Sequence, residues 1–388
     1  MSYIGSKPAD AVLETDDIAD GVVTTSKLAD DSVTNPKLST GSQQNFRNII
    51  INGDMSIAQR GTSTSGIGSS NGYFSCDRFS TLTASGNTMR FTQTQDTDVP
   101  TGQGFTTSLK MDCTTAEASL SAGRRLIINQ KFEGQNLQYL KKGTANAESL
   151  TLSFWVKSNK TGTYICELYD NDNTRQISKA YTIDSASTWE KKTITFAGDT
   201  NGVLDNDNGG SLDCNFWLAG GSTYSSGTLS TTWTTATSAD RAVGQVNLAD
   251  STDNEWLVTG VQLESGTASD FEFLPYDVNR LRCQRYYYKI TPNFYFTGYN
   301  NSTTLNDGAI MFPTTMRTAP SALEQSGTAS DYSVQRLSTT ATCTSVPTFR
   351  SAGTNGATVR YTVSGNVQGQ GCLLYLTSDG FLAWSAEL

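Results

Sequence analysis

Apolar and polar residues alternate one by one in many short segments of this chain, and this pattern constrains the fold most strongly. In residues 151–157, for example, Leu152, Phe154 and Val156 share one face. The same alternation recurs in residues 125–132, 164–168, 192–196 and 256–263. Strict alternation is typical of strands with one buried and one solvated side. The sequence therefore predicts an all-β protein built around an antiparallel β-sandwich.

In residues 256–263 the alternation places Leu257, Val261 and Leu263 on one face. Helical patterns are scarce, and they predict only a turn or two in residues 135–143, ended by Gly143, and a short helix over residues 277–285 with Asp277 as N-cap.

Composition agrees with the all-β interpretation and excludes several function classes. Charged residues make up 17% of the 388 residues, against about a quarter in average proteins. The net charge is −9 and there is no run of Lys and Arg, so we expect no nucleic-acid binding. No stretch is apolar enough for a membrane span, so we expect no membrane insertion. The first residues lack the apolar core of a signal peptide, so we expect synthesis and assembly in a host cytoplasm.

Histidine is absent, and this narrows the chemistry open to the chain. Ser-His-Asp and Cys-His catalysis, His-ligated zinc and a His general base are excluded. The seven cysteines form no CxxC pattern, and we interpret them as small buried apolar residues. Paired carboxylates remain open as a hydrolytic mechanism, but no spacing among the 37 acidic residues singles out a pair.

A ten-residue unit occurs almost twice near the start of the chain. Residues 18–27 align with residues 28–37, so that Ile18, Leu28 and Leu38 coincide. Each unit has too few apolar side chains to offset the entropy of ordering ten residues by itself. We therefore expect a trimeric neck with these three residues at its threefold axis; a flexible polar linker is the alternative.

The chain is predicted to have three parts. Residues 1–45 hold a docking segment and the repeat neck, residues 46–277 a first β-sandwich, and residues 278–388 a short connector with a small β-sandwich tip.

Several motifs in sequence order are similar to those of bacteriophage tail-fibre proteins, especially marine ones. Tyr-Ile-Gly-Ser-Lys-Pro lies at residues 3–8, and Asn-Ile-Ile-Ile-Asn-Gly-Asp follows at residues 48–54. Further matching segments are residues 55–61, 73–79, 132–137, 150–158, 187–196, 258–266, 271–276 and 282–288. The resemblance covers roughly residues 1–288 and fades after about residue 290.

This resemblance implies a homotrimeric fibre or tailspike-like receptor-binding protein of the virion. Its middle domain would be a jelly roll similar to carbohydrate-binding modules. Residues 1–45 would dock on other tail or adaptor proteins of the virion, and the C-terminal domains would bind a host surface glycan or outer-membrane receptor.

Aromatic side chains are the best candidates for a sugar-binding surface, because the apolar faces of sugar rings stack on aromatic planes. We select residues in or beside loops of the first sandwich and in the aromatic start of the tip: Trp217, Tyr224, Trp233, Tyr287, Tyr295 and Tyr299. Core packing or a trimer interface is the alternative for most of them. Trp155 and Trp256 lie in regular strand patterns and are weaker candidates.

Two oxygen-rich loops contain the ligand types that Ca²⁺ prefers. Their acidic residues are Asp170, Asp172, Asp205 and Asp207. Neither loop completes an EF-hand pattern, and Asx-rich turns explain them equally well without a metal. We expect no other cofactor.

The leading hypothesis is a non-enzymatic phage tail fibre that binds a host receptor. A polysaccharide depolymerase with paired carboxylates and a structural decoration protein of the virion are the rivals. A bacterial carbohydrate-binding module is disfavoured by the apparent lack of a signal peptide.

Overall fold

The computed structural model describes residue 24 and residues 46–337, 339–377 and 379–388. The chain divides at Phe46, and Arg47–Leu388 form one compact unit, the second of the chain. Ile18, Leu28 and Leu38 lie outside the described residues, as does the docking segment, so the trimeric neck stays a prediction.

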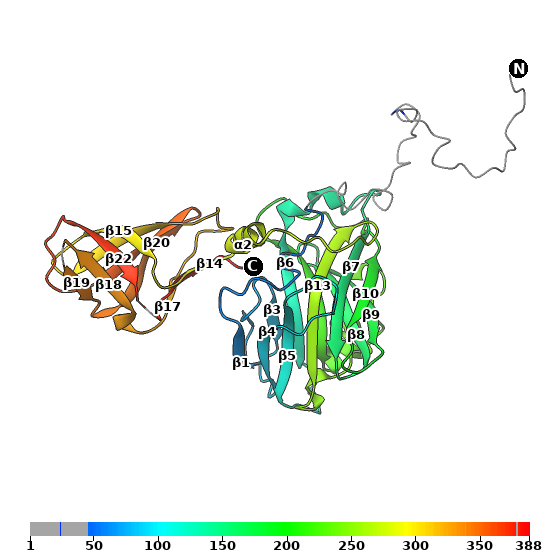
Figure 1. Ribbon diagram of the computed structural model, residues 1–388. Coiled ribbons are helices and arrows are strands. Elements are labelled where there is room, and N and C mark those ends of the chain that lie inside the picture. The colour runs from blue at the N-terminus through cyan, green and yellow to red at the C-terminus, as the bar shows by residue number, and fades with distance from the viewer. Residues whose placement is uncertain (1–23, 25–45, 338, 378) are drawn as a thin grey trace, which may run out of the picture. The chain divides into compact units, whose positions relative to one another are not determined.

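The first part of the second unit is a jelly-roll β-sandwich of two antiparallel sheets (Figure 1). The six-stranded sheet has the order β1 (Ser63–Ile67), β4 (Arg90–Asp96), β5 (Ser108–Thr115), β13 (Glu255–Ser265), β7 (Leu150–Ser158), β10 (Glu190–Phe196). The seven-stranded sheet has the order β12 (Thr234–Thr235), β9 (Arg175–Ile183), β8 (Gly162–Asp170), β11 (Gly210–Gly220), β6 (Arg125–Glu133), β3 (Ser80–Thr83), β2 (Gly72–Tyr73). The predicted all-β architecture is therefore confirmed.

The core of this jelly roll lies between the two sheets and consists of the alternating residues that the sequence indicated. Leu152, Phe154 and Val156 of β7 are fully buried in it, facing residues such as Leu168 of β8. All seven cysteines of the chain are buried and unpaired, as predicted.

One strand departs from simple alternation, and the predicted face of Leu257 was wrong. Trp256 and Val258, rather than Leu257, lie in the core together with Val261. The pairing of β13 with β7 shifts register between Thr259 and Gln262, so a β-bulge exchanges the two faces. Gly260 lies in this bulge with a φ of +61°, a conformation that favours glycine.

The predicted helical segments are present and short. Residues 135–143 contain two 3₁₀ turns, η5 (Gly134–Asn136) and η6 (Gln138–Leu140). Helix α2 (Tyr276–Gln284) begins one residue before the predicted N-cap, with Pro275 in the cap position. Within the described residues, no helix has the length and apolar character needed to cross a membrane.

The second part is a smaller β-sandwich, as predicted, and we call it the tip (Figure 1). Its seven-stranded sheet, here the tip sheet, has the order β19 (Thr339–Thr342), β18 (Tyr332–Arg336), β22 (Gly371–Leu376), β15 (Tyr295–Asn300), β16 (Leu305–Met311), β21 (Gly356–Thr362), β20 (Ser345–Gly353). Its three-stranded sheet has the order β14 (Tyr287–Ile290), β23 (Leu382–Ser385), β17 (Glu324–Gln325). A separate apolar core, which includes Phe296, Leu374 and Trp384, lies in this part.

Buried ion pairs surround the segment that connects the two sandwiches. The guanidinium of Arg285, just after α2, donates to both carboxylate oxygens of Glu133 at 2.7 and 2.6 Å. The hydroxyl of Tyr286 donates to the same carboxylate at 2.5 Å. Arg78 is fully buried, pairs with Glu387 and lies over the Tyr286 ring. The predicted connector is thus part of a packed, hydrogen-bonded structure.

A loop of residues 221–245 covers part of the outer face of the seven-stranded jelly-roll sheet, and a buried carboxylate holds it there. Glu167 of β8 is fully buried and accepts two hydrogen bonds from Arg241 of the loop, at 2.7 and 2.9 Å. It also accepts hydrogen bonds from Trp217 Nε1 at 3.1 Å and from Asn215 Nδ2 at 3.0 Å. The loop and the sheet therefore depend on one acidic side chain for four hydrogen bonds.

Asp213 lies on the same outer face and is expected to make stability depend on pH. Burial raises the pKa of its carboxyl from 3.8 to about 6. The folded state therefore holds the proton to a higher pH than the unfolded chain, and the associated stability is complete below pH 3.8 and lost as the pH rises through 6.

Asp213→Asn keeps the oxygen that accepts from Asn171 Nδ2 at 2.8 Å. Relative to wild type, this variant should gain about 2 to 3 kcal/mol of unfolding free energy between about pH 4 and pH 7. Urea unfolding of both proteins at several pH values measures this difference. Parallel stability profiles for the two proteins would show that the carboxyl titrates normally.

Candidate functional site

The outer face of the tip sheet carries exposed aromatic side chains in a regular arrangement. On β15, Phe296 points into the tip core, so the alternating residues Tyr295 and Tyr299 point outward. The side chains of Tyr295 and Tyr299 are 53% and 52% exposed. The ring of Tyr295 stacks on that of Tyr375 in the neighbouring strand β22, with centroids 4.9 Å apart.

Cross-strand pairing adds polar groups beside these rings. Tyr299 pairs with Asp307 of β16, and Asp307 pairs in turn with Arg360 of β21. The Arg360 guanidinium donates to both oxygens of Asp307 at 2.7 Å. This hydrogen bonding to Arg360 lowers the pKa of the Asp307 carboxyl from its usual value.

The outer face of the tip sheet has an open groove of about 680 Å³. Its lining residues come from β15, β16, β20 and β21 and are Thr297, Gly298, Tyr299, Asp307, Gly308, Ala309, Arg350, Ser351 and Thr358. This volume lies in the range of small-molecule sites, which combine apolar surface with a few polar groups. A floor of small side chains beside one tyrosine and an Arg–Asp pair suits a sugar ring better than a purely apolar ligand.

The structure places the six predicted aromatic residues in different environments. Tyr295 and Tyr299 are brought together on the outer face of the tip sheet, as described above. Tyr287 is buried, because the guanidinium of Arg60 lies 3.6 Å from its ring centre and its hydroxyl donates to Glu324 at 2.9 Å. Its ring is therefore not accessible, contrary to our expectation.

The three candidates of the jelly roll are less accessible than we expected. Trp217 is fully buried, since the loop of residues 221–245 covers its ring and Tyr224 packs on it at 5.3 Å. Trp233 is half-buried, and its Nε1 donates to the backbone oxygen of Ala197 at 2.7 Å. Within the described part of the jelly roll, these three rings form no common exposed surface.

A smaller hollow on the six-stranded jelly-roll sheet involves an aromatic residue that we ranked low. Trp155 of β7 is half-buried and lines a hollow of about 210 Å³ together with Phe105, Phe271 and Phe273. These three phenylalanines pack on one another with ring centroids 4.9 to 5.1 Å apart. The strand pattern could have shown on which face of β7 Trp155 lies. It could not have shown that the three phenylalanines surround it, because they come from distant segments.

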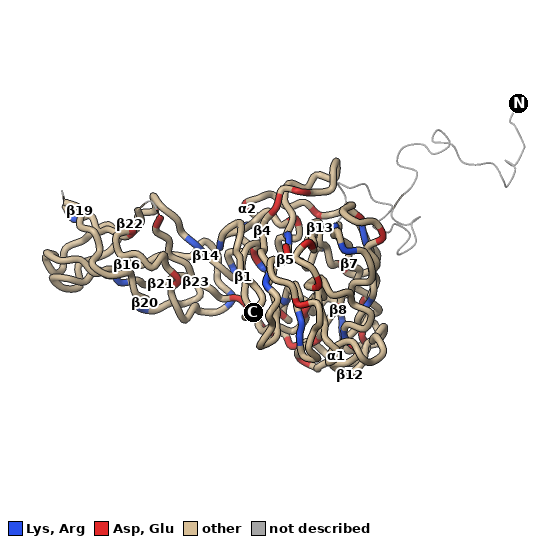
Figure 2. Tube along the Cα trace, turned by 90° about the horizontal axis from the view of Figure 1, so that it is seen from below, with Lys and Arg blue, Asp and Glu red and all other residues tan. Residues whose placement is uncertain are grey.

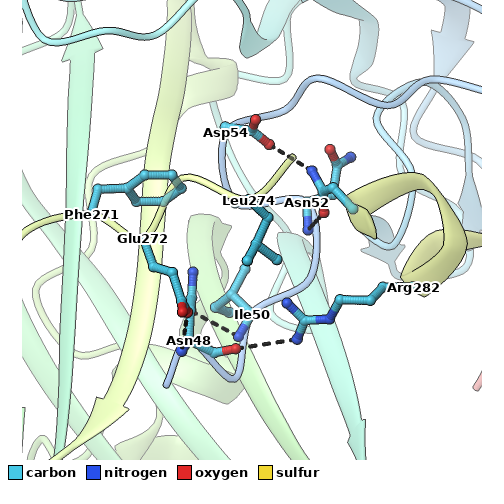
Figure 3. A pocket seen from close by; sticks show the side chains of 10 residues that line it. Asn48, Ile50, Asn52, Asp54, Phe271, Glu272, Leu274 and Arg282 are labelled. Carbon is cyan, nitrogen blue, oxygen red and sulfur yellow. Dashed lines mark hydrogen bonds between the residues drawn. The ribbon is translucent and has the colours of Figure 1, made fainter. Parts of the chain in front are cut away.

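A small hollow beside α2 is filled by structural contacts rather than shaped for a ligand, and it explains the Asn-Ile-Ile-Ile-Asn-Gly-Asp motif (Figure 3). The backbone N–H of Asn48 donates to Glu272, and Arg282 of α2 donates to the backbone oxygen of Asn48 at 3.2 Å. Asn279 of α2 donates to Asp54 at 3.0 Å. The remaining volume of about 10 Å³ holds at most one water.

Gly53 in this motif is required by close packing. A Cβ atom at this position would lie 2.0 Å from the backbone oxygen of Val261, which no side chain can tolerate. The motif thus fastens the first residues of the second unit to β13 and α2.

Three of the four carboxylates chosen as calcium candidates, those of Asp170, Asp172 and Asp207, make contacts within the protein. Asp170 is buried and pairs with Lys142. Asp172 accepts a hydrogen bond from the backbone N–H of Asp205 at 2.9 Å, and Asp207 accepts one from the N–H of Gly209 at 2.8 Å. In the described part of the chain, no three acidic or cysteine side chains gather as a metal-binding group.

Comparison with known proteins gave structural likenesses only. No protein-family model matches this chain, and no curated protein matches it. The enzymatically active domain of tailspike protein 4 from bacteriophage CBA120 aligns with a TM-score of 0.29 and 13% identity, over 57% of this chain and 22% of that one.

Two carbohydrate-binding modules also align with the chain. A family 11 module from Clostridium thermocellum, in complex with a β-1,3-1,4-mixed-linked tetrasaccharide, has a TM-score of 0.27 and 10% identity, over 54% of this chain and 98% of that one. The module TmCBM61, in complex with β-1,4-galactotriose, has a TM-score of 0.26 and 8% identity, over 57% and 99% of the two chains.

Proposed function

We propose that this chain is the subunit of a homotrimeric bacteriophage tail fibre that binds a host surface glycan through the outer face of its tip sheet. The observation that carries the proposal is the pair of exposed rings, Tyr295 and Tyr299, beside the groove with the Arg360–Asp307 ion pair. The ordered tail-fibre motifs in residues 1–288 supply the viral context. Residues 1–45 would attach the fibre to other virion proteins, and assembly would take place in the host cytoplasm.

A binding role fits the groove better than hydrolysis. Glycoside cleavage by paired carboxylates needs two acids, one of them with a raised pKa. Asp307 is the single acidic residue in the groove lining, and its pKa is lowered by Arg360. It therefore lacks both the partner and the proton of a general acid, and we propose that the protein is not an enzyme.

Weak contacts at one groove would be sufficient in a trimer. Three linked sites raise the overall affinity through effective concentration, without any new contact. The groove then needs only modest affinity for each sugar unit.

The oligomeric state and the role of the first residues test this proposal. Size-exclusion chromatography with light scattering should give a trimer for the full chain, whereas a monomer would contradict the fibre. Removing residues 1–45 should prevent incorporation into virions while each remaining tip still binds the purified host glycan with the affinity of a single site. Incubation with host surface polysaccharide should leave its chain length unchanged, and shortened chains would favour the depolymerase.

A further inference from the structure

We propose that the groove of the tip sheet takes an acidic sugar whose carboxylate binds Arg350. This inference rests on the proposed function and narrows the ligand from glycans in general to those that carry a carboxylate. Three charged residues near the groove, Arg350, Arg360 and Asp307, carry the argument.

Arg360 and Asp307 satisfy each other. Both carboxylate oxygens of Asp307 accept a hydrogen bond from Arg360, and Oδ2 accepts a second one from Asn301 Nδ2 at 2.6 Å. The lowered pKa of Asp307 keeps this carboxyl ionised at neutral pH. Little of its hydrogen-bonding capacity remains for a further cation.

The guanidinium N–H groups of Arg350 are available to a ligand. Its side chain is 46% exposed, and its Nε lies 4.0 Å from Asp307 Oδ1, too far for a hydrogen bond. Within the described residues, its guanidinium donates no hydrogen bond at all. A register shift between Phe349 and Ser351 in the pairing of β20 with β21 places Arg350 at a bulge, where side chains are commonly redirected.

The three charged groups at the groove, Arg350, Arg360 and Asp307, together carry one positive charge in an acidic protein. Asp307 and Arg350 are the two charged residues of the lining, and Arg360, which lies beside the lining, neutralises Asp307. The positive charge of Arg350 is therefore left without an equal counter-charge at the groove. The whole chain carries −9, and Figure 2 shows how few charged positions lie on the tip strands. A planar guanidinium with free N–H groups matches a carboxylate in bidentate geometry.

The position of Arg350 relative to Tyr299 suits one sugar residue. Asp307 is the direct cross-strand partner of Tyr299, so their Cα atoms lie about 5 Å apart. The Arg350 guanidinium is next to Asp307. A pyranose ring stacked on Tyr299 would therefore bring a carboxylate attached to the ring within reach of Arg350.

Binding to matched native and carboxyl-reduced polysaccharides tests this inference. The full chain is immobilised and exposed to a panel of purified bacterial capsular polysaccharides and O-chains, each in its native form and with its carboxylates reduced to alcohols. We expect the best native ligand to bind about tenfold or more tighter than its reduced form, the effect of one charge-assisted hydrogen-bonded pair. Arg350→Gln should remove this preference and leave the affinity for the reduced polysaccharide unchanged.

A control variant tests whether the effect is specific to the charge of Arg350. Lys289→Gln removes one positive charge from β14, in the other sheet of the tip, and should retain the preference. Equal binding of native and reduced polysaccharides, or a preference that survives Arg350→Gln, overturns the inference but leaves glycan binding intact. Binding of no polysaccharide in either form contradicts the proposed function itself.

Discussion

Replacing Tyr299 with alanine is expected to weaken binding of each tip to host surface polysaccharide by about 30-fold, the roughly 2 kcal/mol that a central aromatic contact contributes. The reason is that Tyr299 supplies the exposed ring of the groove, and its removal leaves a lining without any aromatic side chain. The same variant should fold normally, since half of this side chain is already in solvent. Calorimetric titration with purified host polysaccharide measures the loss per site.

Trp155→Ala serves as the comparison for Tyr299→Ala. This substitution removes the indole ring from the smaller hollow on the six-stranded jelly-roll sheet and does not change the tip. We expect this variant to keep full affinity. If Trp155→Ala lost binding and Tyr299→Ala kept it, the glycan site would have to be moved from the tip to the jelly roll.

Replacing Glu167 with alanine is expected to lower the free energy of unfolding by about 3 to 5 kcal/mol, because breaking a buried ion pair leaves an uncompensated charge. Arg241 would lose the partner that now accepts its two hydrogen bonds. Trp217 Nε1 and Asn215 Nδ2 would lose their acceptor as well. Urea unfolding followed by tryptophan fluorescence measures the change.

A surface ion pair provides the control for Glu167→Ala. Asp184 pairs with Lys192 at 3.2 Å, but its side chain is 69% exposed, and such pairs are worth little. Asp184→Ala should therefore change the stability by less than about 0.5 kcal/mol. Limited proteolysis should cut the loop of residues 221–245 faster in Glu167→Ala than in the wild type or in Asp184→Ala. Equal destabilisation by the two substitutions would show that Glu167 does not hold the loop.

Local sequence patterns predicted the strands and their buried faces well, because alternation is a property of neighbouring residues. Leu152, Phe154 and Val156 lie in the core as predicted. Tyr295 and Tyr299 lie on the outside because they alternate with the buried Phe296 along β15. The bulge at Gly260 reversed the alternation of β13, which a uniform period of two could not reproduce.

The accessibility of the other aromatic residues depends on distant segments, and the sequence could not show it. Trp217 lies on the outer face of its sheet, yet residues 221–245 fold over it. Tyr287 is buried by Arg60, more than two hundred residues earlier in the chain. The sequence did not mark Arg350 as a candidate. Its donors are free because Arg360, on another strand, donates to both carboxylate oxygens of Asp307. No local signal marks such a residue.

Hydrogen–deuterium exchange of the full chain, with and without purified host surface polysaccharide, tests the central claim most directly. Our account predicts slower exchange upon binding in peptides from β15, β16, β20 and β21, which line the groove, and unchanged exchange in the jelly-roll sheets. Protection confined to the jelly roll, with the tip strands unaffected, would contradict it.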